Sequence, residues 1–335
     1  MSWEKLQSIY GRDGIVLALG SGISIDSGLP DWKNLLKRLT PECISGANDD
    51  LFDQLLAHDF TLPVIASILE EHCRDRNEFI ERVRSCLYRD FPFFPDGVTK
   101  SNRKELIRTI RNTNSTLRAV AALCAVRKRG ALTYIANPRI HAIVSFNLDA
   151  LLQAYVYARF EKRLLRTIER PSASRRSEKI NVYHMHGFVR FDRKAGDLKK
   201  EAPDAVILTE QDYFNFFNDS TSLFNYTFLY LLREFSCLFI GLSMQDENIR
   251  RLLHYSKTER VRSLLNEGVG TNVREKSLRH FAILKRNELE WMNDGVEKSL
   301  LPLGTRVLWI DDYDELAERL AEIYKSTGDD WELVF

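Results

Sequence analysis

The chain has 335 residues, enough for one large domain or two, and its 48 basic and 47 acidic residues leave a net charge of +1. This balance excludes a strong overall field that would recruit nucleic acid or a membrane surface, so we predict neither as a direct partner. No apolar run approaches the length of a membrane span, and no apolar segment follows Met1–Lys5 as in a signal peptide. Five scattered cysteines without a Cys-x-x-Cys pair are typical of reduced thiols, so we expect a cytoplasmic protein without a bound metal.

Short apolar runs alternate with helical patterns along the chain. The runs expected to be strands are 14–19, 140–146, 181–185, 237–242, 281–284 and 307–310, with shorter strands or a hairpin at 189–192 and 205–208. This alternation predicts an α/β fold with a doubly wound, mostly parallel, Rossmann-like sheet.

One long stretch between the first two strands has helical periodicity in its leucines and phenylalanines. We therefore treat 1–335 as one nucleotide-binding domain in which 34–139 is an inserted, mainly helical module. Farther along, we expect a helix from Asp246 to about Tyr255 and a polar loop over 256–279.

The first expected strand ends in a turn rich in glycine and serine, Gly20–Trp32. In α/β folds such a turn lets the backbone approach a phosphate, with N–H groups of the turn and of the next helix facing the anion. A glycine pair alone is equally compatible with a tight turn between a strand and a helix. The Ser-Gly-Leu-Pro-Asp-Trp tail of this turn favours the ligand-binding interpretation.

Four segments in order resemble motifs of the sirtuin family. Gly20–Lys33 resembles the family's cofactor loop, Gly-Ala-Gly-x-Ser-x-x-Ser-Gly-Ile-Pro-Asp-Phe-Arg, and Val144–Asp149 resembles its Gln-Asn-Ile-Asp segment, with Phe146 in place of Gln. Val182–Gly187 is similar to the segment that carries the catalytic histidine, and Leu238–Ser243 is similar to the late strand that ends in Gly-Thr-Ser.

This resemblance implies Asn147 and His186 as catalytic residues and NAD+ as the bound dinucleotide. The residues that it implies for NAD+ binding are Gly20, Ser21, Gly22, Ser24, Ser27, Asp31, Asp149, Gly241 and Ser243. Several of them directly follow apolar runs, and the carboxyl ends of parallel strands meet at one crevice, which supports a common site.

Each of these polar residues also has a structural interpretation. Asn147 and Asp149 could cap the helix that follows them, and both roles can hold together. We expect Asp246 to be a helix cap and His184 to pack or to support the site. His186 could instead make backbone contacts at a strand end, but its place beside Gly187 favours a group that accepts a proton near neutral pH.

Two departures from the family narrow the activity that the resemblance implies. The Cys-x-x-Cys pairs that hold zinc in deacylating sirtuins are absent, and Val206–Tyr213 stands where their acyl-lysine groove segment would be. Together with Met244–Leu253, these replacements resemble the bacterial sirtuin-like effectors of antiphage defence, which hydrolyse NAD+. The leading hypothesis is an NAD+ hydrolase (NADase) that gives nicotinamide and ADP-ribose. An NAD-dependent protein deacylase and a non-catalytic sensor of NAD or ADP-ribose derivatives remain alternatives.

Such an activity would harm its own cell unless it were controlled. We therefore expect a homo-oligomer, a partner protein such as an ATPase or an Argonaute-like protein, as in related systems, or both. The helical stretch 34–139 is the surface that we expect to carry this contact.

Overall fold

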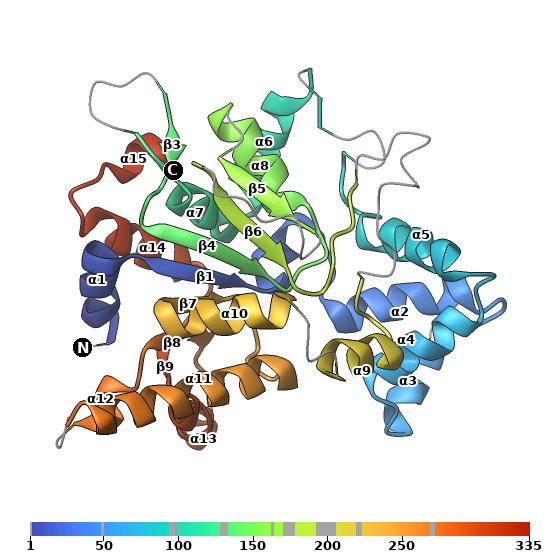
Figure 1. Cartoon of the computed structure of the whole chain (residues 1–335). Coiled ribbons are helices and arrows are strands. Elements are labelled where there is room, and N and C mark those ends of the chain that lie inside the picture. Colours follow the sequence, from blue (N-terminus) through green and yellow to red (C-terminus); the bar gives the residue numbers. More distant parts are fainter. Residues whose placement is uncertain are drawn as a thin grey trace.

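One parallel sheet organises the part of the chain that the computed structural model describes, namely residues 2–47, 50–93, 98–99, 101–127, 133–161, 164–169, 178–191, 206–218, 223–268 and 272–335. Within these residues, 7 strands pair in the order β5-β6-β4-β1-β7-β8-β9, all parallel (Figure 1). Their bounds are Ile15–Leu19 (β1), Ile140–Ser145 (β4), Leu165–Ile168 (β5), Ile180–His184 (β6), Ser236–Ile240 (β7), His280–Lys285 (β8) and Thr305–Ile310 (β9). The predicted doubly wound α/β fold is thereby confirmed. A separate antiparallel pair joins β2 (Ala125–Val126) to β3 (Ile135–Ala136).

The central strand β1 shows why both faces of the sheet are covered. All of its residues are buried. Because side chains alternate across a strand, Leu17 and Leu19 enter one apolar core, whereas Val16 and Ala18 enter the other. A parallel strand buried on both faces is a continuous apolar run, which is the pattern that the sequence shows here.

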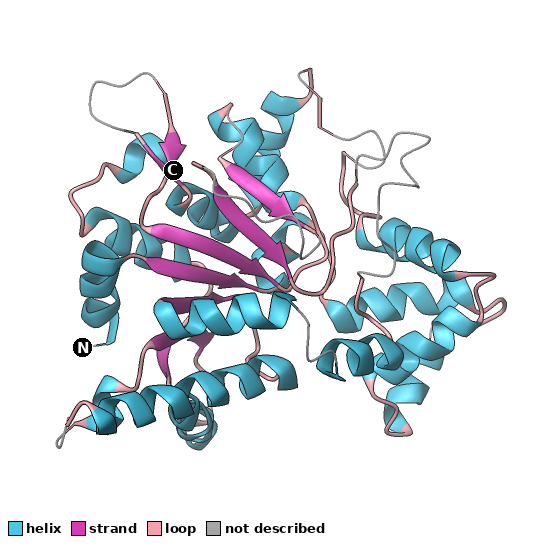
Figure 2. Cartoon of the chain, viewed as in Figure 1, coloured by secondary structure: helices cyan, strands magenta, loops and turns pink. Residues whose placement is uncertain are grey.

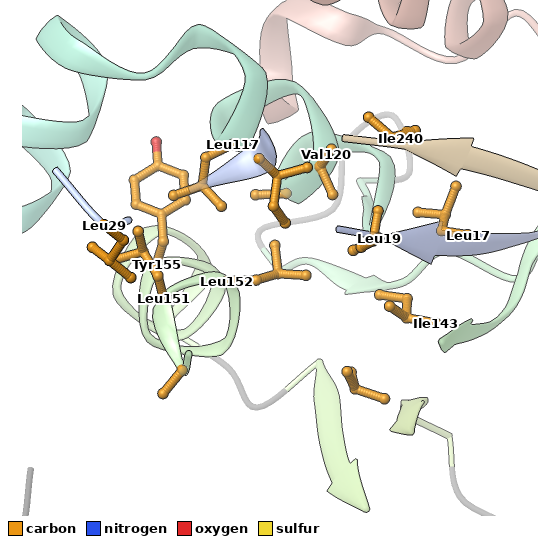
Figure 3. Packing of buried hydrophobic residues seen from close by; sticks show 14 of the residues in the cluster. Leu17, Leu19, Leu29, Leu117, Val120, Ile143, Leu151, Leu152, Tyr155 and Ile240 are labelled. Carbon is orange, nitrogen blue, oxygen red and sulfur yellow. The ribbon is translucent and has the colours of Figure 1, made fainter. Parts of the chain in front are cut away.

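Helices cover both faces of the sheet (Figure 2). On the face of Leu17 and Leu19 lie α1 (Ser2–Asp13), α6 (Arg103–Thr113), α7 (Ser115–Leu123), α8 (Leu151–Phe160), α14 (Glu315–Lys325) and α15 (Trp331–Val334). On the other face lie α10 (Leu223–Glu234), α11 (Glu247–Asn266) and the end of α13 (Glu290–Leu300). Figure 3 shows apolar side chains of α7 and α8 gathered over β1 and β4. No helix within the described ranges is both long and apolar enough to cross a membrane.

A group of helices lies beyond the carboxyl ends of β1 and β4 (Figure 1). It consists of α2 (Trp32–Cys43), α3 (Leu51–Ala57), α4 (Leu62–Glu71), α5 (Arg76–Leu87) and α9 (Glu210–Asn218). Arg76 ties α5 to α9, since its guanidinium lies 2.9 Å from the carboxylate of Asp212 and 2.6 Å from the carbonyl of Val206. The last helices of 34–139, α6 and α7, instead pack with α8 and α14 on the sheet. That stretch therefore contributes both to the helical group and to the cover of the sheet.

Some local predictions were wrong. Helix α11 continues to Asn266, well into the expected loop 256–279, because Ser256 and Leu264 are buried against the rest of the fold. A short helix, α12 (Val273–Lys276), follows in the same stretch. The described residues of 189–192 and 205–208 form no strand, while Asp192 and Ala205 lie outside the described residues. These segments make single backbone bonds, from Val189 N to the Leu148 carbonyl at 2.7 Å and from Ile207 N to the His186 carbonyl at 3.0 Å.

Candidate active site

Residues that follow β1, β4, β6 and β7 line a common cavity of about 880 Å³. We call its two extremes the β6 end and the β9 end. The β6 end is lined by Phe146, Asn147, His186, Tyr213 and Asp246, and the β9 end by Lys285, Asn287, Met292, Trp309 and Tyr313. Gly20, Ser21, Gly22, Gly241 and Ser243, which follow the central strands β1 and β7, line it between these ends, and Asp31 and Asp149 line it as well. The structure therefore brings together all of the predicted site residues except Ser24 and Ser27, which do not line the cavity.

The glycines after β1 and β7 allow two turns to pack backbone against backbone. A Cβ on Gly22 would lie 2.7 Å from the Cα of Gly241, and one on Gly20 would lie 2.3 Å from the Gly241 carbonyl oxygen. Gly20 N donates to the Ile240 carbonyl at 3.0 Å, and Gly22 N donates to that of Gly241 at 3.1 Å. These two amides hold the turn against the end of β7 and are therefore not available to an anion, whereas the expectation for the other amides of the turn stays a prediction. The hydroxyl-bearing residues Ser21 and Ser243 remain in the cavity wall.

Ser24 and Ser27 hold the turn in place. The Ser24 hydroxyl donates to Oδ2 of Asp149 at 3.0 Å. The side-chain amide of Asn114, at the start of α7, donates to the Ser27 hydroxyl at 2.8 Å and to the Ile23 carbonyl at 2.9 Å. Asn114 was missed from the sequence, where it is one polar residue between two helices and no motif marks it.

Both predicted aspartates accept a hydrogen bond from a backbone N–H at the start of a helix, and both also line the cavity. Asp31 Oδ1 accepts from Asn34 N at 2.8 Å and so caps α2. Asp149 Oδ1 accepts from Leu151 N at 2.9 Å, the first N–H of α8, although the N-cap position of that helix is Ala150. Burial raises the pKa of Asp149, and the bonds from Leu151 and Ser24 oppose that shift. A carboxyl group of this kind can take part in hydrogen bonding to a ligand amide or hydroxyl.

Asn147 is held through its backbone, which leaves its side chain for the cavity. The Nδ1 of His184 lies 3.0 Å from the Asn147 carbonyl oxygen, and its Nε2 lies 2.6 Å from the side-chain amide of Gln153. These two partners fit a neutral imidazole that donates from Nδ1 and accepts at Nε2. Burial lowers the pKa of His184 to about 4. These contacts are consistent with the expectation that His184 supports the site. The side-chain Oδ1 of Asn147 is itself buried without a hydrogen-bond partner among the described residues.

His186 lies just past β6 with its ring among aromatic side chains. The ring centroids of Phe146, Tyr213 and Phe216 lie 5.3, 5.8 and 6.1 Å from that of the imidazole, each in an edge-on arrangement. Burial lowers the pKa of His186, and the nearby Asp246 carboxylate opposes the shift. The imidazole is thus neutral at neutral pH and able to accept a proton. Its Nε2 is buried without a hydrogen-bond partner among the described residues.

Asp246 has the predicted capping role, since its Oδ1 accepts from Ile249 N at 2.8 Å at the start of α11. Its other oxygen, Oδ2, lies 3.8 Å from Nε2 of His186, a contact that the sequence did not reveal. Tyr213 and Phe216 were also missed at the β6 end, because the spacing of aromatic residues in α9 indicates packing and not a site.

Several polar groups at the β9 end bind one another or a neighbouring side chain. Asn293 accepts from Asn287 N at 2.7 Å and donates to the Asn287 carbonyl at 2.8 Å. The Lys285 ammonium lies 2.7 Å from the carboxylate of Asp312. Trp309 and the half-exposed Tyr313 add aromatic surface to the cavity. No motif in the sequence pointed to this end.

The five cysteines are free thiols. The sulfurs of Cys43 and Cys73 lie 3.7 Å apart in the helical group, and burial raises the pKa of Cys43 to about 12. The described residues hold no group of three or more histidine, cysteine, aspartate or glutamate side chains placed to bind a metal ion. The absence of a structural zinc ion stays a prediction, which elemental analysis of the purified chain tests.

Comparison with protein families adds an independent finding. Residues 141–300 match the family described as a SIR2-like domain. The matched range holds Asn147, His186, Gly241 and Ser243, whereas the glycine-rich turn after β1 precedes it. No curated protein matched the chain. The predicted sirtuin-like character is therefore confirmed over 141–300, and it indicates an enzyme that uses NAD+.

Proposed function

We propose that this chain, whose residues 141–300 match a SIR2-like domain, hydrolyses NAD+ at the bond between nicotinamide and ribose. The observation that carries the proposal is the pair of buried atoms without partners at the β6 end, Asn147 Oδ1 and His186 Nε2. A buried polar atom without a hydrogen bond costs about 1–3 kcal/mol. Two such atoms at one end of a cavity favour a ligand whose hydroxyl or amide groups form hydrogen bonds with them.

The cavity has the size and the position that a dinucleotide needs. Its volume of about 880 Å³ lies within the range of small-molecule and cofactor sites. It runs along the carboxyl edge of the sheet, where open α/β folds bind dinucleotides. In the proposed complex the nicotinamide ribose lies at the β6 end, the diphosphate passes the turn that holds Ser21 and Ser243, and the adenosine lies against Trp309 and Tyr313.

The chemistry follows from the charge of the substrate. The bond from the ribose carbon to the pyridinium nitrogen breaks, and its electron pair neutralises that nitrogen, so nicotinamide leaves without charge. The ribose carbon gains oxocarbenium character, as in glycoside cleavage. Water forms the new bond to this carbon, and its proton passes to neutral His186 and then to solvent. The products are nicotinamide, ADP-ribose and one proton.

The other residues of the β6 end control this step. Asn147 carries no charge to titrate and hydrogen-bonds a ribose hydroxyl or the attacking water through its open Oδ1. The rings of Phe146, Tyr213 and Phe216 keep bulk water from His186. Phe146 stands in place of a glutamine of the sirtuin motif, so an apolar edge replaces a polar group beside the ribose.

The resemblance to antiphage effectors supports a biological role for this activity. In this proposal the protein depletes NAD+ during infection and is held inactive until a self-assembly or a partner protein, such as an ATPase or an Argonaute-like protein, releases it. The helical group α2–α5 borders the cavity through Trp32 and Leu62, so a contact on it can reach the site without entering it.

The purified full chain, incubated with NAD+ alone and with the proteins encoded beside it, tests the activity. Chromatography of nicotinamide and ADP-ribose should show consumption without an acylated peptide, and His254→Ala, an exposed histidine on α11, should match wild type. A deacylase would need the peptide, and a sensor would bind NAD+ in calorimetry without consuming it. Either result would contradict the proposal.

A further inference from the structure

Asp246 is fixed in two ways at the β6 end. Its Oδ1 caps α11 by accepting from Ile249 N at 2.8 Å, which sets the orientation of the carboxylate. The remaining oxygen lies 3.8 Å from Nε2 of His186, and both side chains line the cavity. The capping bond therefore holds a negative charge beside Nε2 of His186, which is buried without a hydrogen-bond partner among the described residues.

From this geometry we infer that Asp246 is a positioning residue of the proposed reaction, acting through His186. The inference rests on the proposed function but concerns a residue that the sirtuin motifs did not select. The gap of 3.8 Å is longer than a hydrogen bond, so the carboxylate acts on the imidazole through its charge and leaves Nε2 open to a hydroxyl of water or ribose.

The charge matters at the moment of proton transfer. When the attacking water gives its proton to Nε2, His186 becomes a cation inside an aromatic enclosure that stabilises it poorly. Asp246 compensates that positive charge until the proton returns to solvent. Without it, burial alone would leave the imidazole a weaker base, because desolvation is the largest cause of its lowered pKa and Asp246 is the group that opposes it.

The other titratable groups around His186 do not supply this charge. Burial raises the pKa of Tyr213, on α9, so its hydroxyl stays neutral. Asp212, also on α9, lies 2.9 Å from the Arg76 guanidinium, which balances its charge. His184, on β6, is a neutral imidazole bonded to Gln153 and to the Asn147 carbonyl. Asp149, after β4, is bonded to Ser24 and Leu151, and burial raises its pKa.

The test uses Asp246→Asn in the full chain. Asparagine is as good a helix cap as aspartate, so α11 keeps its start while the charge is removed. We expect an unfolding midpoint near wild type, a turnover lower by about 10- to 100-fold, and an acid limb of the pH profile moved to lower pH by about one unit. The matched control is Asp75→Asn, which removes the charge of another capping aspartate, on α5 and outside the cavity, and should leave all three unchanged.

A second measurement separates this inference from the proposed function. The imidazole of His186 is titrated by NMR in the protein without NAD+, its signal being assigned by its absence in His186→Ala. The pKa of His186 should be lower in Asp246→Asn than in wild type or Asp75→Asn. If the wild-type chain leaves NAD+ intact, the proposed function fails while this titration still decides the pairing. The inference about Asp246 would be overturned by an equal pKa of His186 in wild type and Asp246→Asn. It would also be overturned if Asp246→Asn lost turnover while the acid limb of its pH profile stayed in place.

Discussion

The β6 end and the β9 end of the cavity differ in whether their polar side chains have partners within the protein. At the β9 end, Asn287 and Asn293 exchange hydrogen bonds, and Lys285 lies 2.7 Å from the carboxylate of Asp312. At the β6 end, Asn147 and His186 each keep a buried atom without a partner among the described residues. In the proposed complex, the substrate supplies the missing partners at the β6 end.

This difference indicates which end carries the chemistry. Buried polar atoms are normally hydrogen-bonded, and exceptions cluster where a function requires them. The β9 end offers aromatic surface and internally paired polar groups, which suits binding of a base and ribose without reaction. The β6 end offers a neutral imidazole and an open amide oxygen, which suits proton transfer. The predictions below test that division, beginning with the largest effect.

Removing the open groups should abolish the activity and leave the fold intact. We expect His186→Ala to lower NAD+ turnover by about 1000-fold or more, since a positioned base contributes about 10²–10⁴-fold. Asn147→Ala, which removes the hydrogen bond to the ribose or the water, should cause a comparable loss. Neither open atom contributes a hydrogen bond to the described fold, so unfolding midpoints should stay near wild type. Nicotinamide release and thermal unfolding measure the two effects. Retained turnover in His186→Ala would remove this residue from the mechanism.

The turn between the two ends should be sensitive to a single methyl group. In Gly22→Ala the new Cβ would lie 2.7 Å from the Cα of Gly241, which forces apart the turns after β1 and β7. We expect a loss of about 3 kcal/mol in the free energy of unfolding, at the upper range for overpacking, together with weaker NAD+ binding.

Gly295→Ala is the matched control for this substitution. It places the same methyl group within α13, where no atom beyond the neighbouring helix backbone lies within 4 Å, and should stabilise the chain by about 0.5–1 kcal/mol because alanine favours a helix. Urea unfolding compares the two variants. An equal stability for Gly22→Ala and wild type would show that the two turns do not pack as described.

Much of the β6 end could be predicted from the sequence because its residues follow apolar strands in recognisable order. Asn147 and His186 are such residues, and the parallel sheet brings them together. Asn114 and Tyr213 could not be found in that way, since Asn114 is a single polar residue between two helices and Tyr213 belongs to a helix whose aromatic spacing indicates packing alone. The donation from Gly22 N to the Gly241 carbonyl was also hidden, because it depends on the pairing of β1 with a strand far along the chain.

His184 and His186 differ in their hydrogen bonds: both ring nitrogens of His184 have partners, whereas Nε2 of His186 has none among the described residues. His184→Ala should lose about 2 kcal/mol at pH 7, because it leaves Gln153 and the Asn147 carbonyl without their buried partner. The pKa of His184 is about 4 in the fold, against an ordinary value of 6.5, so the unfolded chain binds more protons between these values. The contribution of His184 is therefore complete above pH 6.5 and decreases as the pH falls toward 4.

Urea unfolding of wild type and His184→Ala at pH 7 and pH 5 measures this dependence. The difference in unfolding free energy between the two proteins should be smaller at pH 5, because only wild type loses the His184 contribution. The other buried histidines, His186 and His280, are present in both proteins and cancel in the comparison. A difference that is equal at both pH values would contradict the neutral, paired state of His184.

The smallest effect should come from the β9 end. Tyr313 lines the cavity but is half exposed, so Tyr313→Ala should leave the free energy of unfolding within about 0.5 kcal/mol of wild type, as surface substitutions do. If the proposed complex is right, KM for NAD+ should rise about threefold to tenfold through lost stacking on the adenosine, with kcat unchanged because that complex places the reacting bond at the other end. Steady-state kinetics at saturating and limiting NAD+ separate the two parameters. A fall in kcat with an unchanged KM would place Tyr313 in the chemical step and break the division between a reacting end and a binding end.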